Sequence, residues 1–543
     1  MKTTTHAGIG SFPTDPAGLP APEATRIVEL ADGDTYDLRI TPIANRVGDD
    51  TVRMLGYNGS VPGPTLRVRQ GSEIAVRVLN DGDHETTVHW HGLRLANQYD
   101  GVPFETQPPI PVGGEFTYRL RFPDDGLYWY HPHVREDYGL EMGLYGAILV
   151  DPADPEAWAP VDQEVVATLD DVLIEDGRIA SFSAAGPTYT AMGRFGNVML
   201  TSGETDLRLA VRTGSVVRFF VVNTANTRIF NVSIPGARMK LVGGDNGRYE
   251  HEAFVDAVLL APSERAAVDV LFTSAGVFAI EHNTPTQAYR LGEVVVAGEP
   301  GARSRVETFE RLRDNDELAR ERARLADECA RVPDKTLVFD AEMPLLYGGE
   351  QQQGSAWTCP MHPEVVSDTQ ATCPKCGMKL IAVVGSPSPT DSRHGMELGG
   401  HVEHGDTGDG LEWEDLMPDI NARADGTNMI WKLVDRETGK VNHAIDWTFR
   451  VADRVKIRLV NTMDSDHPMH HPFHVHGVGR FLVIAREDVP ASNLVWKDTV
   501  LVRSGETVDI VLHVTEPGRW MAHCHIAEHN QNGMMFSLDV EPG

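Results

Sequence analysis

Residues 503–525 read RSGETVDIVLHVTEPGRWMAHCH, and this stretch decides the fold class. It contains a polar turn, an alternating apolar run, a turn with glycine, an aromatic residue, and a second run that ends in histidine. Such alternation is typical of half-buried β-strands. The same order recurs in residues 112–133 (VGGEFTYRLRFPDDGLYWYHPH) and in residues 261–283 (APSERAAVDVLFTSAGVFAIEHN). The chain therefore carries three copies of one two-strand unit.

A second pattern accompanies each copy. Residues 66–80, 209–223 and 449–461 each combine a turn with a β-branched-rich strand that closes on asparagine. Two linked patterns in three copies predict an all-β protein of three homologous Greek-key β-sandwich domains. The interval between the second and third copies is longer than the interval between the first two, so domain three is expected to hold an insertion.

The connections between these domains differ in composition from the strands. Residues 304–331 are rich in arginine, glutamate, leucine and alanine and lack proline and glycine, which predicts one linker helix. A segment as long as 348–425 without strand rhythm is improbable in a compact domain unless it has a role of its own. The predicted boundaries are 1–31 for an N-terminal tail, 32–155 for domain one, 156–300 for domain two, 301–333 for the helical linker, and 334–543 for domain three with its insertion at 345–427.

Composition excludes several classes of partner. The 543 residues carry a net charge of −31, so we expect no nucleic-acid binding and no attraction to anionic lipid. No apolar window is long enough for a membrane span, and 41% hydrophobic residues suffice for packed cores. Residues 1–31 lack the apolar segment of a secretory signal. The expected location is therefore cytoplasmic as numbered, or periplasmic or secreted if a leader was removed.

The 22 histidines beside only five cysteines indicate metal binding rather than a disulfide framework. On a strand, a His-x-His pair places both imidazoles on one face. The middle repeat has Asn231, Ser233 and His282 at the matching positions, so we expect that it holds no metal. Ten histidines fall in four short clusters of the first and last repeats: His89 and His91; His131 and His133; His471, His474 and His476; and His523, His525 and His529.

The last cluster predicts a blue copper site. His529 lies five residues after Cys524 and Met534 lies ten residues after it. With His471 they supply two imidazoles, a thiolate and a thioether, the ligand set typical of blue copper. On its strand Cys524 faces away from its two neighbouring histidines, so it gives electrons a covalent route between adjacent metal sites. The eight remaining clustered histidines form a neutral imidazole site suited to copper.

The order HxH, HxH, HxxHxH, HCHxxxHxxxxM resembles the multicopper oxidases, over nearly the whole chain apart from the insertion and the N-terminal tail. The resemblance implies three cupredoxin domains, four copper ions, and a trinuclear cluster between domains one and three that reduces O₂ to two waters. It implies a type 1 copper at His471, Cys524, His529 and Met534, a type 2 copper at His89 and His474, and a type 3 pair at His91, His131, His133, His476, His523 and His525.

The resemblance also assigns catalytic roles. Asp100 matches the family acid that helps proton delivery, and Cys524 with His523 and His525 is expected to carry electrons to the cluster. Many bacterial members have a second acid directly after the last type 1 histidine, but here that residue is Asn530. Glu528 stands nearby and is expected to point to the other face. Another acidic residue, Asp498, is expected to anchor a turn.

The insertion contains a second metal-ligand pattern. Cys359 and His362, followed by Cys373 and Cys376, form a closed four-ligand set for copper or zinc. Residues 357–383 resemble the small heavy-metal-binding module of copper-transporting ATPases and metal-efflux proteins. The module is either a structural zinc knuckle or a device that captures metal for the enzyme. Beyond it lie four further residues that could hold copper weakly: His394, Met396, His401 and His404.

The electron donor is left open by the sequence. In the family, donors reach the type 1 copper through an exposed histidine, and phenolic or aromatic donors need only an open pocket. In similar cuprous oxidases, a methionine two residues and an acid four residues before the first type 1 histidine bind substrate Cu(I). Met469 fits the first position, and His467 occupies the second. An alternative is a copper-binding or scavenging protein in copper homeostasis whose oxidase activity is secondary.

Overall fold

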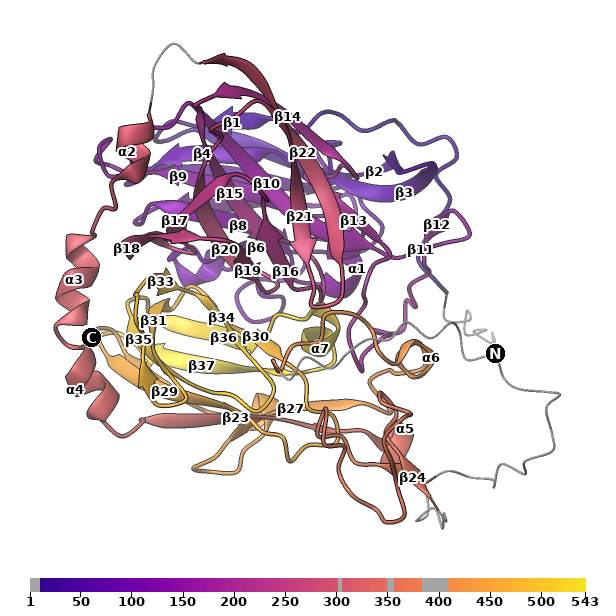
Figure 1. The fold of residues 1–543 in the computed structure, drawn as a ribbon. Coiled ribbons are helices and arrows are strands. Elements are labelled where there is room, and N and C mark those ends of the chain that lie inside the picture. The colour runs from indigo at the N-terminus through magenta and orange to yellow at the C-terminus, as the bar shows by residue number, and fades with distance from the viewer. Residues whose placement is uncertain (1–9, 301–304, 349–355, 383–408) are drawn as a thin grey trace.

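The computed structural model describes residues 10–300, 305–348, 356–382 and 409–543 (Figure 1). Strands dominate these residues and pack as three β-sandwiches, which confirms the all-β prediction. Figure 1 shows the first two sandwiches together in the upper part of the molecule and the third sandwich below them.

The first sandwich consists of two mixed sheets. Its elements are β1 (Ile27–Glu29), β2 (Thr35–Val47), β3 (Asp50–Tyr57), β4 (Thr65–Arg69), β5 (Glu73–Asn80), β6 (Val88–His91), η1 (Asn97–Tyr99), β7 (Glu115–Arg121), β8 (Gly126–Pro132), α1 (Glu136–Glu141) and β9 (Gly146–Asp151). One sheet has the order β1-β4-β9-β8-β6 and the other the order β3-β2-β5-β7. Because β6 ends one sheet, its histidines lie at an edge that the third sandwich can approach.

The second sandwich repeats this plan. Its elements are β10 (Gln163–Val172), β11 (Ile174–Glu175), β12 (Arg178–Ile179), β13 (Val198–Thr201), β14 (Leu207–Thr213), β15 (Val216–Asn223), β16 (Phe230–Ser233), β17 (Arg238–Gly244), β18 (Gly247–Val255), β19 (Val258–Leu260), β20 (Arg265–Leu271), β21 (Gly276–Asn283) and β22 (Ala288–Pro300). The sheets have the orders β13-β10-β15-β20-β17-β18 and β14-β22-β21-β16-β19, and β11 pairs with β12.

The third sandwich carries the C-terminal half of the histidine clusters. Its elements are β23 (Lys335–Glu342), β27 (Ile430–Asp435), η2 (Asn442–Ala444), β28 (Thr448–Arg450), β29 (Arg454–Asn461), β30 (His471–Val475), β31 (Gly479–Arg486), β32 (Val489–Pro490), β33 (Trp496–Lys497), β34 (Thr499–Val502), β35 (Thr507–Val514), β36 (Gly518–Cys524), α7 (Ala527–Gln531) and β37 (Met535–Glu541). One sheet has the order β27-β23-β29-β35-β31-β32, with β33 beside β31, and the other has the order β28-β37-β36-β30-β34.

The linker is helical, but it forms three short helices instead of one. These helices run along one side of the molecule (Figure 1) and are α2 (Val306–Glu310), α3 (Asp316–Arg322) and α4 (Leu325–Ala330). The chain leaves α2 at Arg311, whose backbone is extended, and Asp314 bridges to His251. The side chain of Asn315 then accepts a hydrogen bond from the Glu317 backbone and caps α3. Composition showed helix-forming residues but not these local interruptions.

The insertion leaves and returns between adjacent strands, because β23 pairs antiparallel with β27 and Glu342 lies opposite Ile430. Its described part contains α5 (Pro344–Tyr347), β24 (Trp357–Thr358), β25 (Val366–Ser367), β26 (Ile381–Ala382) and α6 (Pro418–Asn421). The three short strands form one sheet in the order β25-β24-β26. The weaker candidate ligands His394, Met396, His401 and His404 lie outside the described residues.

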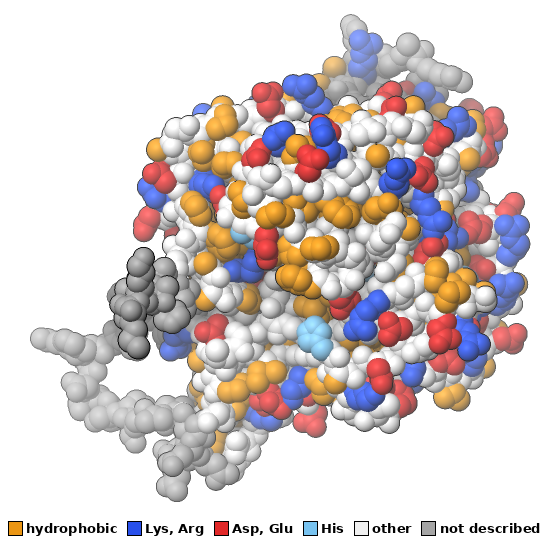
Figure 2. Space-filling view, turned by 180° about the vertical axis from the view of Figure 1, so that it is seen from behind, with side chains coloured by type: hydrophobic (Ala, Val, Ile, Leu, Met, Phe, Trp, Pro, Cys, Tyr) orange, Lys and Arg blue, Asp and Glu red, His pale blue; other side chains and the backbone are white. Residues whose placement is uncertain are grey.

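On the face shown in Figure 2, lysine and arginine side chains are interspersed with aspartate and glutamate side chains. Among the described residues, none of the helices has both the length and the apolar character needed to span a membrane.

Candidate metal centres

Eight imidazoles from the first and third sandwiches form one buried group. In β6 and β8, His89 lies opposite His131, and in β30 and β36, His474 lies opposite His523. The rings of His91 and His474 stack across the two domains with centroids 3.7 Å apart. Strand register and domain packing thus bring all four sequence clusters together. We call this group the eight-histidine cluster: His89, His91, His131, His133, His474, His476, His523 and His525.

Backbone carbonyl groups orient several of these rings. The Nδ1 atom of His89 lies 2.7 Å from the carbonyl oxygen of Asp100, and that of His474 lies 2.9 Å from the carbonyl oxygen of Asp498. His131 bonds to the next residue's carbonyl in the same way. A carbonyl oxygen only accepts, so each Nδ1 carries the proton and each Nε2 keeps a lone pair. These buried Nε2 atoms have no hydrogen-bond partner in the described part of the chain, which suits metal ligands.

Asp100 also orients a second ring from the third sandwich. Its Oδ2 atom accepts a hydrogen bond from Nδ1 of His476 at 2.8 Å, and Nδ1 of His523 donates to the carbonyl of Cys524 at 2.8 Å. The Nε2 atoms of His476 and His523 then face each other at 3.0 Å, both with lone pairs. Two lone pairs at this separation repel each other unless a cation lies between them. The donor set of the cluster therefore fits a metal ion.

The protonation state of the cluster agrees with this assignment. Burial, reinforced by neighbouring imidazoles, lowers the pKa of His91, His131 and His525 well below the ordinary histidine value. Neutral imidazoles are the form that binds metal, and an all-imidazole set suits copper. The cluster is thus ready for metal without first losing protons.

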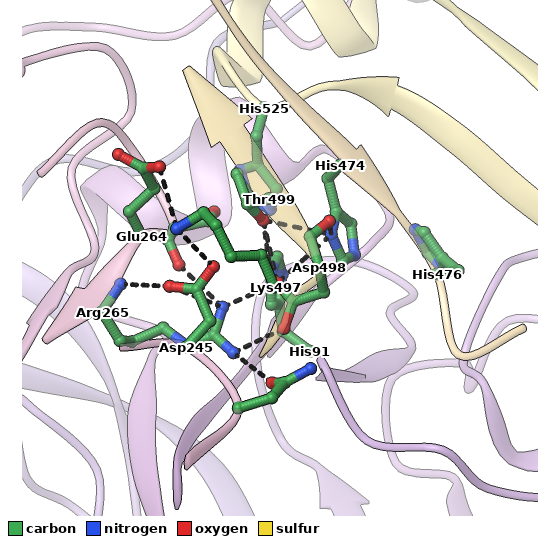
Figure 3. A network of polar contacts seen from close by, with 12 residues as sticks. His91, Asp245, Glu264, Arg265, His474, His476, Lys497, Asp498, Thr499 and His525 are labelled. Atoms are coloured by element: carbon green, nitrogen blue, oxygen red, sulfur yellow. Dashed lines mark hydrogen bonds and ion pairs between the residues drawn. The ribbon is translucent and has the colours of Figure 1, made fainter. Parts of the chain in front are cut away.

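The side chain of Asp498 contacts the eight-histidine cluster, and the prediction that it anchors a turn is wrong. Its Oδ1 atom lies 2.9 Å from Nε2 of His91, and its carboxylate pairs with Arg265 at 2.7 and 2.5 Å (Figure 3). Burial alone would raise the pKa of Asp498, but the guanidinium overrides that effect and lowers it to about 2. Asp498 is therefore an anion that holds His91 with Nδ1 free for a metal.

Arg265 comes from β20 of the middle sandwich, which supplies none of the eight histidines. Lys497, which precedes Asp498 in the chain, forms ion pairs with Asp245 at 2.9 Å and with Glu264 at 3.2 Å (Figure 3). These pairs and the Arg265–Asp498 pair join the middle and third sandwiches. The backbone N–H of Arg265 donates to Asp245 at 2.8 Å. The middle sandwich thus contributes to the site by fixing the residue that orients His91.

Glu136 is a second residue that sequence reasoning missed. From α1, its Oε1 atom lies 3.3 Å from Nδ1 of His131 and 3.6 Å from Nε2 of His525. Its other oxygen accepts a hydrogen bond from Asn530 at 2.6 Å. Burial raises the pKa of Glu136 to about 8. The only sequence signal was an acid three residues after the second His-x-His pair. Asn530, which replaces the expected acid, thus contacts an acid from the first sandwich.

A separate group surrounds Cys524. Its Sγ atom lies 3.4 Å from Nδ1 of His471 and 3.8 Å from Nδ1 of His529, and all three side chains are buried. Met534 is buried beside them, and its backbone N–H donates to the carbonyl of His529 at 3.0 Å. Burial raises the pKa of the Cys524 thiol well above its usual value. We call these four residues the Cys524 site; the structure brings the ligand atoms of His471, Cys524 and His529 together and buries Met534 in the same core.

Both histidines of the Cys524 site are buried, whereas donors in the family reach an exposed one. Both His471 and His529 lie within the described core, at most 1% exposed. The indole ring of Trp431 stacks on His529 with centroids 4.0 Å apart and meets His471 edge-on at 5.0 Å. The rings are covered because β27, which follows the insertion, carries Trp431 against both of them. A bulky donor therefore has no direct contact with either imidazole among the described residues.

The four predicted ligands of the insertion also converge. The Sγ atom of Cys359 lies 3.5 Å from that of Cys376 and 3.7 Å from Nδ1 of His362, and Cys373 lies 3.6 Å from the same nitrogen. These separations fit one metal ion with sulfur and nitrogen ligands. We call residues 356–382 the cysteine module. Its thiols and methionines are part of the hydrophobic core of the third sandwich, so the module is packed against the oxidase domain.

Of the two residues expected near substrate Cu(I), His467 contacts this module. Met469 and His467 are both fully buried. The Nδ1 atom of His467 lies 3.4 Å from the Sδ atom of Met378, which belongs to the cysteine module. The structure thus adds a residue from the insertion to the pair that the sequence indicated.

The lone histidine of the middle sandwich has a structural role. Nδ1 of His282 accepts a hydrogen bond from the backbone N–H of Asn231 at 3.0 Å. Burial, together with the positive charge of Arg228, lowers the pKa of His282 to about 3. The ring is therefore neutral in the folded protein at all but strongly acidic pH.

His282 should make the protein less stable as the pH falls below about 6.5, because the unfolded chain takes up a proton there and the folded chain does not. Between pH 7 and pH 5, wild type should lose about 2 kcal/mol more stability than His282→Gln. Urea unfolding at both pH values measures the difference, and groups common to both proteins cancel. Parallel pH profiles would contradict the lowered pKa.

Comparisons with known proteins agree with these centres. Multicopper oxidase sequence models match residues 41–155, 167–295 and 417–543, and a heavy metal binding domain model matches residues 356–383. The fold and site define a copper-binding oxidoreductase built from cupredoxin domains. The chain belongs to the multicopper oxidase family, whose members use O₂.

Individual relatives cover the chain almost completely. It is 27% identical to the multicopper oxidase MmcO of Mycobacterium tuberculosis, over 96% of this chain and 90% of that protein. It is 24% identical to copper resistance protein A of Escherichia coli, over 94% and 93% of the two chains. A multicopper oxidase of Campylobacter jejuni, described as a metallo-oxidase, has the same fold with a TM-score of 0.66, at 19% identity over 100% of this chain and 99% of that one.

Proposed function

We propose that the protein is a cuprous oxidase, in which Cu(I) is the electron donor and O₂ the acceptor. When bound, the coppers take up electrons singly at the Cys524 site and reduce O₂ by four electrons to water at the eight-histidine cluster. The proposed ligands are His471, Cys524, His529 and Met534 for type 1; His89 and His474 for type 2; and His91, His131, His133, His476, His523 and His525 for type 3. The cysteine module holds one further copper or zinc ion.

Residues of the chain transfer electrons, orient the ligands and deliver protons. Cys524 links the two centres covalently, because it is a ligand at one and its two sequence neighbours are ligands at the other. The peptide carbonyls and Asp498 keep the imidazoles oriented. Asp100 accepts a hydrogen bond from Nδ1 of His476, and its carboxylate helps to deliver protons to the cluster. Four Cu(I), one O₂ and four protons give four Cu(II) and two waters, so charge and atoms balance.

The burial of the Cys524 site carries this proposal. A phenol transfers an electron best when it contacts an exposed imidazole edge, whereas both rings here lie under Trp431. The ring of His467 lies beside Trp431 with centroids 5.7 Å apart, and its Nδ1 atom lies 3.4 Å from the Sδ atom of Met378. The side chains of His467, Met378 and Met469 are all fully buried. Thioether and imidazole ligands favour Cu(I) over harder cations. The names of the relatives, which include a copper resistance protein, support the same choice of donor.

Oxygen uptake by the copper-loaded protein tests the proposal, with Cu(I) and a phenol offered separately. We expect rapid uptake with Cu(I), at four Cu(I) per O₂, and slow uptake with the phenol because Trp431 covers the rings. Cu(I) without protein measures autoxidation. Uptake with the phenol alone would exclude Cu(I) as donor, and no uptake with either would exclude an oxidase. The latter result, with metal still bound, is what the copper-scavenging alternative requires.

A further inference from the structure

The insertion returns to the third sandwich through a loop that is fixed on the turn between β34 and β35. We call residues 409–417 the return segment. The backbone N–H of Ser504 donates to the carbonyl of Gly410 at 3.0 Å, and the guanidinium of Arg503 donates to the carbonyl of Asp409 at 2.9 Å. Gly410 has a φ of +72°, and a Cβ atom there would lie 2.8 Å from the carbonyl oxygen of Ser504, so the close fit favours glycine.

Two apolar side chains hold the return segment at the junction of the middle and third sandwiches. Leu411 and Trp413 pack there against three buried side chains, Ile229, Ala261 and Leu501. Between them in the sequence stands Glu412, an acid that is itself buried. The contacts on both sides of Glu412 therefore determine where its carboxylate lies.

Glu412 binds the residue that directly precedes the ligand His471. Its Oε2 atom accepts hydrogen bonds from the backbone N–H of His470 at 3.0 Å and from Nδ1 of the same residue at 2.5 Å. Within the described residues, Glu412 is the only hydrogen-bonding partner of the fully buried His470 ring. One carboxylate oxygen thus fixes both the backbone and the side chain next to the first ligand of the Cys524 site.

No lysine or arginine among the described residues forms an ion pair with Glu412. Its Oε1 atom lies 3.4 Å from the hydroxyl of Ser504, which is neutral. Glu414, two residues further along, differs because it pairs with Arg228 at 3.1 Å. A buried carboxylate is costly unless positive charge balances it. The Cys524 site supplies such charge when it holds copper, because one thiolate balances only one of the two charges of Cu(II).

The charge of Glu412 acts on the loop that leads to these ligands. Burial lowers the pKa of His467, and the carboxylate of Glu412 opposes that shift. Burial also lowers the pKa of His471 and of His529, and the ring of His470 contributes to both shifts. Glu412 and the ring it binds therefore lie close to both imidazole ligands, in an interior where charges interact more strongly than in water.

We propose that Glu412 is a positioning residue whose negative charge lowers the reduction potential of the copper at the Cys524 site and thereby favours strong reductants such as Cu(I) as donors; the choice of donor rests on the proposed function. One electron from the donor reduces Cu(II) to Cu(I) at this site, and Glu412 itself is unchanged. A nearby negative charge stabilises Cu(II) more than Cu(I), because reduction removes one unit of positive charge. Phenols give up an electron less readily than Cu(I), so a lower potential slows their oxidation more.

Replacement of Glu412 by glutamine tests the charge with little change in shape, because the amide oxygen still accepts from the backbone of His470. The measurement is a redox titration of the blue absorption of the copper-loaded protein. We expect the equilibrium constant for reduction to rise about tenfold, which raises the midpoint of this one-electron couple by about 59 mV. Glu412→Asp, which keeps the charge, should stay closer to wild type.

A second variant leaves Glu412 in place and compensates its charge. Ser504→Lys puts an ammonium group beside Oε1 of Glu412 and should also raise the potential, whereas Ser504→Met, of similar length but neutral, should not. Glu414→Gln is the matched control on the return segment and should leave the potential unchanged, because Arg228 already balances that acid. All these variants should remain blue, because the four ligands of the Cys524 site are intact.

The outcomes separate this inference from the proposed function. An unchanged potential in Glu412→Gln, or an equal rise in Glu412→Gln and Glu412→Asp, would overturn the role of the charge. Should Glu412→Gln fail to hold copper, equal potentials in Ser504→Lys and Ser504→Met would overturn it. The titration needs no particular donor, so a wild type that does not oxidise Cu(I) would overturn the proposed function while the effect of Glu412 on the potential stood.

Discussion

Replacement of Cys524 by serine should abolish the blue colour and lower O₂ consumption with any donor by about 10³-fold or more. The thiolate is the only sulfur anion of the Cys524 site, and a serine hydroxyl is a poor substitute ligand for copper. The same residue joins the site covalently to His523 and His525. One substitution therefore removes both the electron acceptor and its connection to the eight-histidine cluster. Absorption spectra and oxygen-electrode measurements at equal copper loading check this expectation.

Cys329→Ser is the matched control for this prediction. Cys329 lies on α4 and is half-buried, and its thiol donates to the carbonyl of Ile484 at 3.6 Å. Its loss should leave colour and activity unchanged. The type 2 electron paramagnetic resonance signal of Cys524→Ser should persist, because the histidines of the cluster remain. A blue Cys524→Ser protein would refute the assignment of this thiolate to the type 1 copper.

The metal ligands could be predicted from the sequence because strand geometry determines them locally. Two histidines separated by one residue on a strand share a face. The pairing of β6 with β8 and of β30 with β36 joins the four groups into two halves, and domain packing then brings the halves together. The ligands of the cysteine module could also be predicted, because they are close in sequence and two short turns are enough to bring them together. In the eight-histidine cluster and in the cysteine module, the spacing of the ligands and their chemistry therefore point to the same metal site.

The orientation of the ligands could not be predicted in this way. His91 and Asp498 are 407 residues apart, and Asp498 and Arg265 are 233 residues apart. No local pattern connects residues from three domains. The burial of His471 and His529 was missed for a related reason: it depends on where the insertion returns and places Trp431, not on the motif. Packing between domains therefore determines the orientation of the ligands and the burial of the Cys524 site, which the motifs alone do not specify.

The middle sandwich shows why a domain without metal ligands is essential to the metal site. Its Arg265 is fully buried and makes a two-bond ion pair with Asp498, and its Asp245 and Glu264 bind Lys497. A buried carboxylate next to a metal ligand is costly unless a cation compensates it. The middle sandwich supplies that cation to a site formed by the two others.

Arg265→Leu should accordingly cost about 3–5 kcal/mol of stability, because it leaves the Asp498 carboxylate buried without a counter-charge. It should also disturb the eight-histidine cluster, since an unpaired Asp498 would take up a proton or move and no longer hold Nε2 of His91. We expect loss of copper from the cluster and a weaker near-ultraviolet absorption of the paired coppers. Denaturant unfolding and metal analysis measure the two effects.

Arg218→Leu separates these two effects. Arg218 and Asp269 form an equally buried two-bond pair, at 2.7 and 2.9 Å, in the same sandwich but without any contact to the eight-histidine cluster in the described structure. Both variants should lose similar stability, but only Arg265→Leu should lose copper from the cluster, and Arg265→Lys should restore part of it by returning the charge. Equal copper loss in both variants would mean that Arg265 acts through general stability. Normal copper content in Arg265→Leu would show that Asp498 does not need its cation to orient His91.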